Sequence, residues 1–336
     1  MALSQPTAWS ADTLLPDFAA ATLPFPADYD GPVYATLVRR KTASVTTKAF
    51  LYIHGYMDYF FQTHLAAACN AQGYTFYALD LRKYGRSLGP TQHPNFCKDL
   101  HEYFAEISVA LRIITEEEGH DWVVLSGHST GGLTAALYAN EGPEKARIDA
   151  LFLNSPFFDF NLDPKQRRQI EIAARLGAIF PFMALQRKEP VPYIESIHAD
   201  HHGEWPFDLR FRPLNSFPIY AGWLRAVQRA QRQLRRGLAI HCPVLVMHAD
   251  KSVYGRRWRP DFQAGDGVLN VVHIREGSRH LGTNVKVVEI EDGLHDLILS
   301  RPEVRAAVFT QLFEWLANVE QSSDRRPEWQ LSTLMS

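Results

Sequence analysis

A serine in a glycine-flanked turn has the clearest capacity for chemistry in this sequence. Residues 127–131 read GHSTG, a G-x-S-x-G pattern with Ser129 at its centre. A strand-like run, WVVLS, precedes the pattern, and a helix-like run, LTAALYAN, follows it. Such a strand–turn–helix context exposes a nucleophilic serine above the edge of a sheet, with the amides at the helix start directed at it. The pattern therefore predicts acyl-transfer chemistry at Ser129.

A nucleophilic serine needs a base, and the base needs an acid that orients it. The expected chain order is serine, acid, histidine. His295 lies in EIEDGLHD (289–296), just after the last strand-like run, and is the predicted base. The acid should follow the run VLVM (244–247), where two residues compete. We favour Asp266, which precedes a helical segment at 271–281, over Asp250, which follows the strand almost directly.

Acyl transfer also needs two amides that stabilise the developing oxyanion. One is expected from Thr130, the residue after the nucleophile. The other is expected from the loop HGYMD (54–58), which follows the strand-like run AFLYI. Gly55 lets this backbone turn inward, so Tyr56 is the predicted second donor.

The elements that must position these residues are short apolar runs alternating with helical segments. Strands are predicted at 33–38, 49–53, 75–79, 122–126, 150–153, 244–247 and 285–290, and helices at 61–71, 101–117, 132–140 and 305–319. Most of the strand runs are continuously apolar, which is typical of strands buried on both faces of a parallel sheet. The alternation predicts the α/β class, with a mostly parallel, doubly wound sheet.

One stretch interrupts this alternation and divides the predicted core into residues 33–155 and 238–319. Residues 156–237 are predicted to form an inserted lid over the ligand-binding edge of the sheet, with helices at 166–176 and 220–236. Its aromatic residues either line a substrate pocket or pack the lid onto the core; the substrate-binding candidates are Phe157, Phe158, Trp205 and Trp223. Residues 1–32 are predicted to be an extended lead-in over the surface, and residues 320–336 a polar tail.

A group of arginines in the second lid helix has two readings. Arg225, Arg229, Arg232, Arg235 and Arg236 either meet an anionic lipid or acidic substrate or form a solvated helix face. The solvated face is the more common case for such a run, and we favour it here.

The composition excludes several classes of protein. The 336 residues are 46% hydrophobic and 21% charged with a net charge of −2, which argues against general disorder, nucleic-acid binding and a polybasic membrane tail. The three cysteines are widely spaced and none sits in a C-x-x-C pair, so neither a zinc ribbon nor a dithiol redox site is predicted, and no other metal signature is found. They fit a reducing compartment, and with no signal peptide or transmembrane run evident we expect a cytoplasmic protein. Apolar surface on the lid leaves a homodimer possible.

The quoted motifs together resemble a known family. LYIHG (51–55), DLRKYGRS (80–87), GHSTGG (127–132), the Asp266 segment and GLHD (293–296) are similar to those of the α/β-hydrolase superfamily. Within it the chain resembles the serine aminopeptidase S33 and monoacylglycerol lipase (lysophospholipase)-like group, over about residues 33–317 without the lid. The resemblance implies an α/β-hydrolase fold, a catalytic triad with Ser129 and His295, and no cofactor.

Two features depart from the group's usual pattern. Residues 56–58 are bulkier than expected, and the loop between Asp250 and Asp266 is longer, which leaves the identity of the acid open. The predicted function is a serine hydrolase of a lipid-like or small acyl ester. One alternative is an amide or peptide hydrolase that holds a substrate ammonium group with Glu189, Glu195 or Glu204. Another is a non-catalytic binding protein with this fold, although a complete serine, histidine and acid set favours an enzyme.

Overall fold

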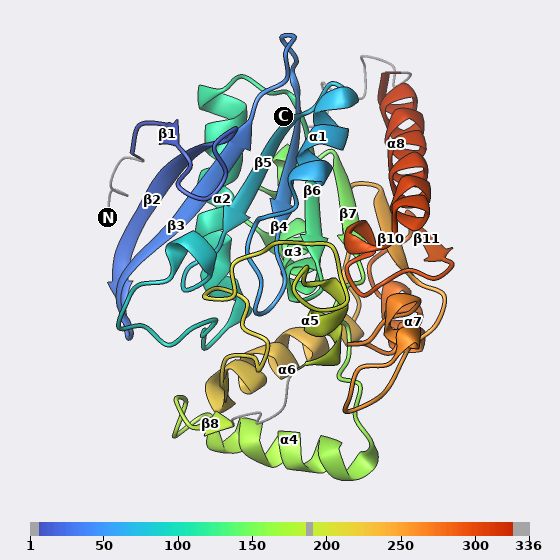
Figure 1. Cartoon of the computed structure of the whole chain (residues 1–336). Coiled ribbons are helices and arrows are strands. Elements are labelled where there is room, and N and C mark those ends of the chain that lie inside the picture. Colours follow the sequence, from blue (N-terminus) through green and yellow to red (C-terminus); the bar gives the residue numbers. More distant parts are fainter. Residues whose placement is uncertain (1–6, 186–190, 325–336) are drawn as a thin grey trace.

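A twisted, mostly parallel sheet forms the centre of the molecule (Figure 1). The computed structural model describes residues 7–185 and 191–324. Nine strands of this described part make one sheet, in the order β1 (Ser10–Ala11), β2 (Ala19–Asp28), β3 (Gly31–Arg40), β5 (Thr75–Asp80), β4 (Lys48–Ile53), β6 (Trp122–His128), β7 (Ala150–Asn154), β10 (Val244–Ala249) and β11 (Val285–Ile290). Strands β5, β4, β6, β7, β10 and β11 pair in parallel with one another, whereas the pairs β1–β2, β2–β3 and β3–β5 are antiparallel. The predicted α/β class with a mostly parallel sheet is confirmed.

The continuously apolar sequence runs correspond to the central strands. Every residue of β5, β7 and β10 is buried, because helices cover both faces of the sheet there. Strand β11 lies at the edge and is largely exposed or half-buried. Because β4, β6, β10 and β11 share one direction, the loops that follow them emerge at the same edge of the sheet. These are the loops that carry the predicted site residues.

Helices pack on the two faces of the sheet in separate hydrophobic clusters. One cluster contains residues of α2 (Phe104–Arg112), α3 (Thr130–Glu141) and α6 (Ala221–Arg235), and Ile274 of α7 (Val271–Ser278) joins it. The other contains residues of α1 (Thr63–Ala71) and α8 (Pro302–Asp324). Short turns complete the chain: the 3-10 helices η1 (Gly85–Ser87), η2 (Leu100–Tyr103), η4 (Lys145–Arg147), η5 (Pro260–Gln263) and η6 (Leu297–Leu299), and the π-helix η3 (Ile113–Glu117). None of the described helices is long and apolar enough to cross a membrane.

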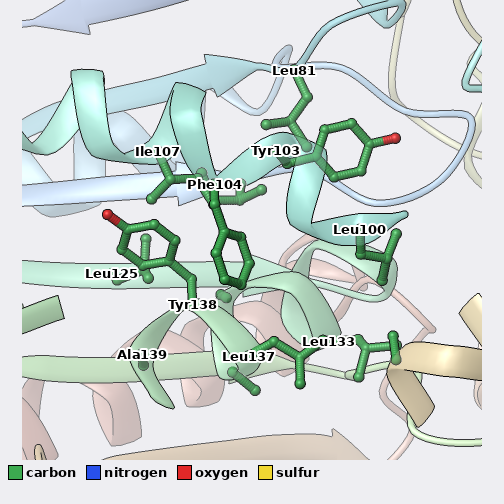
Figure 2. Packing of buried hydrophobic residues seen from close by; sticks show 14 of the residues in the cluster. Leu81, Leu100, Tyr103, Phe104, Ile107, Leu125, Leu133, Leu137, Tyr138 and Ala139 are labelled. Atoms are coloured by element: carbon green, nitrogen blue, oxygen red, sulfur yellow. The ribbon is translucent and has the colours of Figure 1, made fainter. Parts of the chain in front are cut away.

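Helix α3, which begins directly after Ser129, is fixed by its contacts with α2 (Figure 2). The rings of Phe104 and Tyr138 meet edge to face, with their centroids 5.0 Å apart. The Tyr138 hydroxyl also lies 2.7 Å from the hydroxyl of Ser108 on α2. Such edge-to-face aromatic pairs contribute about 1 kcal/mol beyond the area they bury. These contacts hold the C-terminal half of α3 against α2.

The chain between β7 and β10 is the segment predicted to form a lid. It contains α4 (Pro164–Leu176), β8 (Ala184–Leu185), α5 (Pro192–Ile197), β9 (Ile219–Tyr220) and α6, with β8 and β9 paired antiparallel. The two helices predicted at 166–176 and 220–236 correspond to α4 and α6. Figure 1 shows α4, α5 and α6 gathered beyond one end of the sheet. We call residues 156–237 the insertion.

Both ends of the chain differ from the predictions. Residues 19–28 of the predicted lead-in form β2, which pairs with β3 over most of its length. Pro24 and Pro26 suggested a loop, but β2 has only the two-residue β1 on its other side, and prolines are tolerated where a strand edge is free. At the other end, α8 continues to Asp324, so residues 320–324 of the predicted tail are helical. The remainder of that tail lies outside the described residues.

Candidate active site

The turn between β6 and α3 holds Ser129 in a strained backbone conformation. Ser129 has φ 53° and ψ −117°, and positive φ is costly for a residue with a side chain. The glycines on either side are required by close backbone contacts. A Cβ on Gly131 would lie 2.2 Å from the carbonyl oxygen of His54, and one on Gly127 would lie 2.4 Å from the carbonyl oxygen of Gly131. The G-x-S-x-G pattern therefore reflects a tight turn that raises the serine above the sheet edge.

The structure brings Ser129, His295 and Asp266 into one hydrogen-bonded line. His295 Nε2 lies 3.0 Å from Ser129 Oγ, and His295 Nδ1 lies 2.9 Å from Asp266 Oδ2. All three side chains are buried, with Ser129 the most exposed at 8%. The other oxygen of Asp266 accepts hydrogen bonds from the amides of Val268 and Leu269. Both carboxylate oxygens are thus satisfied, and the acid has one orientation toward the imidazole.

The second candidate acid, Asp250, lies elsewhere. One of its oxygens accepts a hydrogen bond from the amide of Asp292 at 2.9 Å, and the other lies 3.4 Å from Lys251 Nζ. It therefore connects the turns after β10 and β11. The long loop after it returns to its starting point, because Asp266 pairs with Ser252 in an isolated bridge and its amide bonds to the Lys251 carbonyl. This return places Asp266 near the end of β10.

The two predicted oxyanion donors, Tyr56 and Thr130, line the same cavity as Ser129. Gly55 allows the loop after β4 to approach the nucleophile, since a Cβ there would lie 3.1 Å from Ser129 Cβ. The ring of Tyr56 packs on Trp223 of α6, with ring centroids 4.1 Å apart, and its hydroxyl donates to the carbonyl of Pro218. The Tyr56 side chain thus connects the loop after β4 to the insertion.

A cavity of about 370 Å³ opens above Ser129 between the sheet edge and the insertion. Its lining is mostly apolar and includes Phe157, Phe160, Leu162, Ile170, Trp223 and Leu269. Two of the four predicted substrate-binding residues, Phe157 and Trp223, therefore face it.

The other two substrate-binding candidates serve packing. Phe158 is buried against Gly277 of α7, where an added Cβ would lie 2.6 Å from the Phe158 side chain. Trp205 stacks on His64 and donates its indole N–H to the carbonyl of Leu299. The sequence pattern could not separate these roles, because all four are aromatic residues of the same insertion and Phe157 and Phe158 are adjacent.

Comparisons with known proteins agree with this geometry. The family model described as "Serine aminopeptidase, S33" matches residues 45–257, more than half of the chain. The chain belongs to the serine aminopeptidase family. A monoacylglycerol lipase of Mycolicibacterium smegmatis is 27% identical over 231 residues, covering 64% of this chain and 75% of that protein. The chain is therefore a hydrolase of the α/β type.

Solved structures of similar fold include two lipases. A monoacylglycerol lipase of Paleococcus ferrophilus superposes with a TM-score of 0.64 and 21% identity, covering 84% of this chain and 99% of that one. A soluble variant of monoglyceride lipase from Saccharomyces cerevisiae, crystallised with a substrate analog, gives a TM-score of 0.63 and 16% identity, covering 92% and 98%. At these identities the superpositions establish the fold.

A buried polar network that the sequence did not reveal surrounds Ser129, His295 and Asp266. Arg212, from the insertion, pairs with Asp58 at 2.8 Å, and both side chains line the cavity. Asp296 accepts a hydrogen bond from Asn154 Nδ2 at 2.6 Å, and its own amide donates to the Tyr193 hydroxyl. Two sequence signals could have pointed to this network. Asn154 is the last residue of β7, and Asp296 directly follows His295.

Burial shifts the pKa of two groups in this network. It lowers the pKa of His128 to about 4, so the histidine beside the nucleophile is neutral near pH 7. Its ring lies 4.8 Å from that of His295. Burial also raises the pKa of Asp58 to about 7, although Arg212 opposes this shift.

Neither a metal site nor an ammonium site is assigned among the described residues. Asp58, His128 and Asp296 offer ligand atoms within 4.8 Å of one another, but Arg212 and Asn154 already occupy the two carboxylates. Of the glutamates considered for a substrate ammonium, Glu204 pairs with Arg305, and neither Glu204 nor Glu195 lines the cavity. Glu189 lies outside the described residues.

Proposed function

We propose that the protein is a serine esterase that cleaves a lipid-like or small acyl ester through Ser129, His295 and Asp266. The observation that carries the proposal is the 3.0 Å approach of His295 Nε2 to Ser129 Oγ at the base of a mostly apolar cavity. An apolar lining suits a hydrocarbon acyl chain. The lipid esters named for the similar lipases from M. smegmatis and P. ferrophilus support the same class of substrate.

In the proposed mechanism the ester is cleaved in two acyl-transfer steps. Ser129 Oγ attacks the carbonyl carbon while its proton passes to His295 Nε2. The Asp266 carboxylate accepts a hydrogen bond from the Nδ1–H of His295, which fixes the tautomer and stabilises the imidazolium. The backbone amides of Thr130 and Tyr56 are the proposed oxyanion donors. His295 then protonates the leaving alkoxide. A water molecule deprotonated by His295 attacks the acyl carbon, and His295 returns the proton to Ser129 Oγ as the carboxylic acid leaves.

Ester cleavage is favoured over aminopeptidase cleavage by the electrostatics of the cavity. An aminopeptidase needs a free carboxylate for the substrate ammonium group, but Asp58, the acid in the cavity wall near Tyr56, is paired with Arg212.

The three cysteines are unpaired and buried, which favours a reducing compartment, and a cytoplasmic location remains a prediction. A homodimer likewise remains a prediction.

The deciding experiment is hydrolysis of p-nitrophenyl esters from acetate to palmitate, with aminoacyl p-nitroanilides in parallel. We expect a chain-length optimum on the esters and loss of activity in Ser129→Ala, while circular dichroism shows that the variant is folded. Activity confined to the anilides would identify the alternative peptidase. A folded wild type inactive on both series would support the non-catalytic alternative.

A further inference from the structure

A second cavity, lined by arginines, lies between α4 and α6 of the insertion. Its volume is about 400 Å³. Arg167, Glu171 and Arg175 follow one another at four-residue spacing on α4, so they share a helix face. Arg225, Arg232 and Arg235 face them from α6. The two helices approach closely at one end, where a Cβ on Gly177 would lie 2.3 Å from the carbonyl oxygen of Ala221.

The positive charge of this arginine cavity is not balanced within the described part of the chain. Five guanidinium groups line it against two carboxylates, those of Asp159 and Glu171. Asp159 pairs with Arg167 and, at 3.9 Å, with Arg235. No ion pair is found for Arg175, Arg225 or Arg232 among the described residues. Burial and the neighbouring arginines, Arg235 first, lower the pKa of Arg232, which reflects crowding of like charges.

The arginine cavity adjoins the cavity above Ser129. Phe160, Leu162 and Ile170 line both of them, so a strip of three apolar side chains separates the nucleophile's cavity from the guanidinium groups. A ligand that occupied both cavities would cross this strip with its hydrocarbon part. Its far end would then meet several arginines, which bind carboxylate and phosphate groups in a bidentate manner.

We infer that the substrate is an acyl ester whose hydrocarbon chain ends in an anionic group, and that Arg225 and Arg232 bind this group. The inference rests on the proposed esterase function and specifies the substrate class of the same site. A terminal carboxylate and a terminal phosphate share the required chemistry. Free phosphate without an attached chain is the other possible source, and the experiment separates it from the substrate.

The test compares mono-p-nitrophenyl esters of long dicarboxylic acids with neutral p-nitrophenyl esters of matched chain length. In the wild type we expect kcat/KM to be about tenfold higher for the anionic ester at its best length, through a lower KM, as charge-assisted hydrogen bonds would give. The preference should weaken with added salt because the arginines are partly exposed. In Arg225→Gln/Arg232→Gln the ratio of anionic to neutral kcat/KM should fall to about one.

Arg168→Gln is the matched control, since Arg168 is an exposed residue of α4 outside the lining of the cavity. It should keep the full preference. Equal rates for anionic and neutral esters in the wild type would overturn the inference while leaving the esterase intact, and so would a preference that survives the double substitution. Inorganic phosphate that binds the cavity without competing with the anionic ester would show a free-anion site instead. If no ester of either kind is hydrolysed, the proposed function itself fails, and the inference fails with it.

Discussion

The guanidinium of Arg212 lies 2.8 Å from a carboxylate oxygen of Asp58, and both side chains are buried. Arg212 belongs to the insertion between α5 and β9, whereas Asp58 lies in the loop after β4, two residues beyond Tyr56. The pair therefore fastens the insertion to the loop that carries a proposed oxyanion donor. Tyr56 makes a second connection through Trp223.

Replacing Arg212 with methionine should destabilise the protein and slow ester cleavage. The change leaves Asp58 buried without its partner, and because burial then favours the protonated carboxyl, the loss in unfolding free energy should be about 1–3 kcal/mol. Urea denaturation measures this loss. Arg210→Met is the control, because Arg210 is exposed and pairs with Asp208 on the surface, and its unfolding midpoint should barely change. Adding Asp58→Asn to Arg212→Met should recover part of the stability; no recovery would show that the two residues act independently.

The raised pKa of Asp58 predicts a specific pH dependence of stability. Its ordinary value is 3.8, and burial raises it to about 7 in the folded chain. The folded state then holds a proton that the unfolded state has released, so the Asp58 contribution is complete below about pH 4 and is lost as the pH rises through 7. Subtracting the unfolding free energy of Asp58→Asn from that of the wild type isolates this term. The difference should decrease from pH 5 to pH 8, and parallel profiles would contradict the assignment.

Substitution of the two candidate acids should give unequal effects on catalysis. Asp266→Asn keeps the shape of the site but removes the charge that orients His295, so kcat should fall by about 10⁴-fold. Asp250→Asn should leave kcat close to that of the wild type, because Asp250 interacts with Asp292 and Lys251. Single-turnover hydrolysis of a p-nitrophenyl ester compares them directly. A larger loss in the Asp250 variant would reverse the assignment.

Gly131→Ala should lower the unfolding free energy of the protein more than an alanine placed at a glycine with positive φ but open space around it. The new methyl group would meet the carbonyl oxygens of His54 and Ile53 at 2.2 and 2.6 Å, and backbone atoms at a sheet end cannot move aside cheaply. Gly73→Ala is the comparison, since Gly73 has φ +80° but nothing within 4 Å of the added atom. Its cost should be limited to about 1–2 kcal/mol of backbone strain. Thermal unfolding of both variants decides the order.

The sequence was most informative where backbone sterics demand particular residue types. The turn around Ser129 leaves no room for side chains at Gly127 and Gly131, so the glycines of the motif indicate a tight turn. Buried parallel strands were similarly recognisable, because helices on both faces require a continuously apolar run. His295 could be chosen from fourteen histidines because its place after the last strand is fixed by the order of the sheet.

The sequence was less informative where long-range pairing decides the outcome. Asp250 and Asp266 are chemically alike, and the hydrogen bonds that return the loop to Lys251 leave no local pattern. Arg212 could not be singled out in the sequence, because its partner Asp58 lies 154 residues away. Strand β2 was missed since its prolines disfavour a central strand but are compatible with an edge.

The bridge between Ser252 and Asp266 has a consequence for how this family can diversify. The backbone crosses from Lys251 and Val253 to Asp266 through two hydrogen bonds, and the intervening residues form a closed excursion. The backbone position of the acid is therefore set by the ends of the excursion. We expect changes in length among the exposed residues 254–257 to leave the acid in place, whereas the buried Phe262, which packs near Gly267, must be kept.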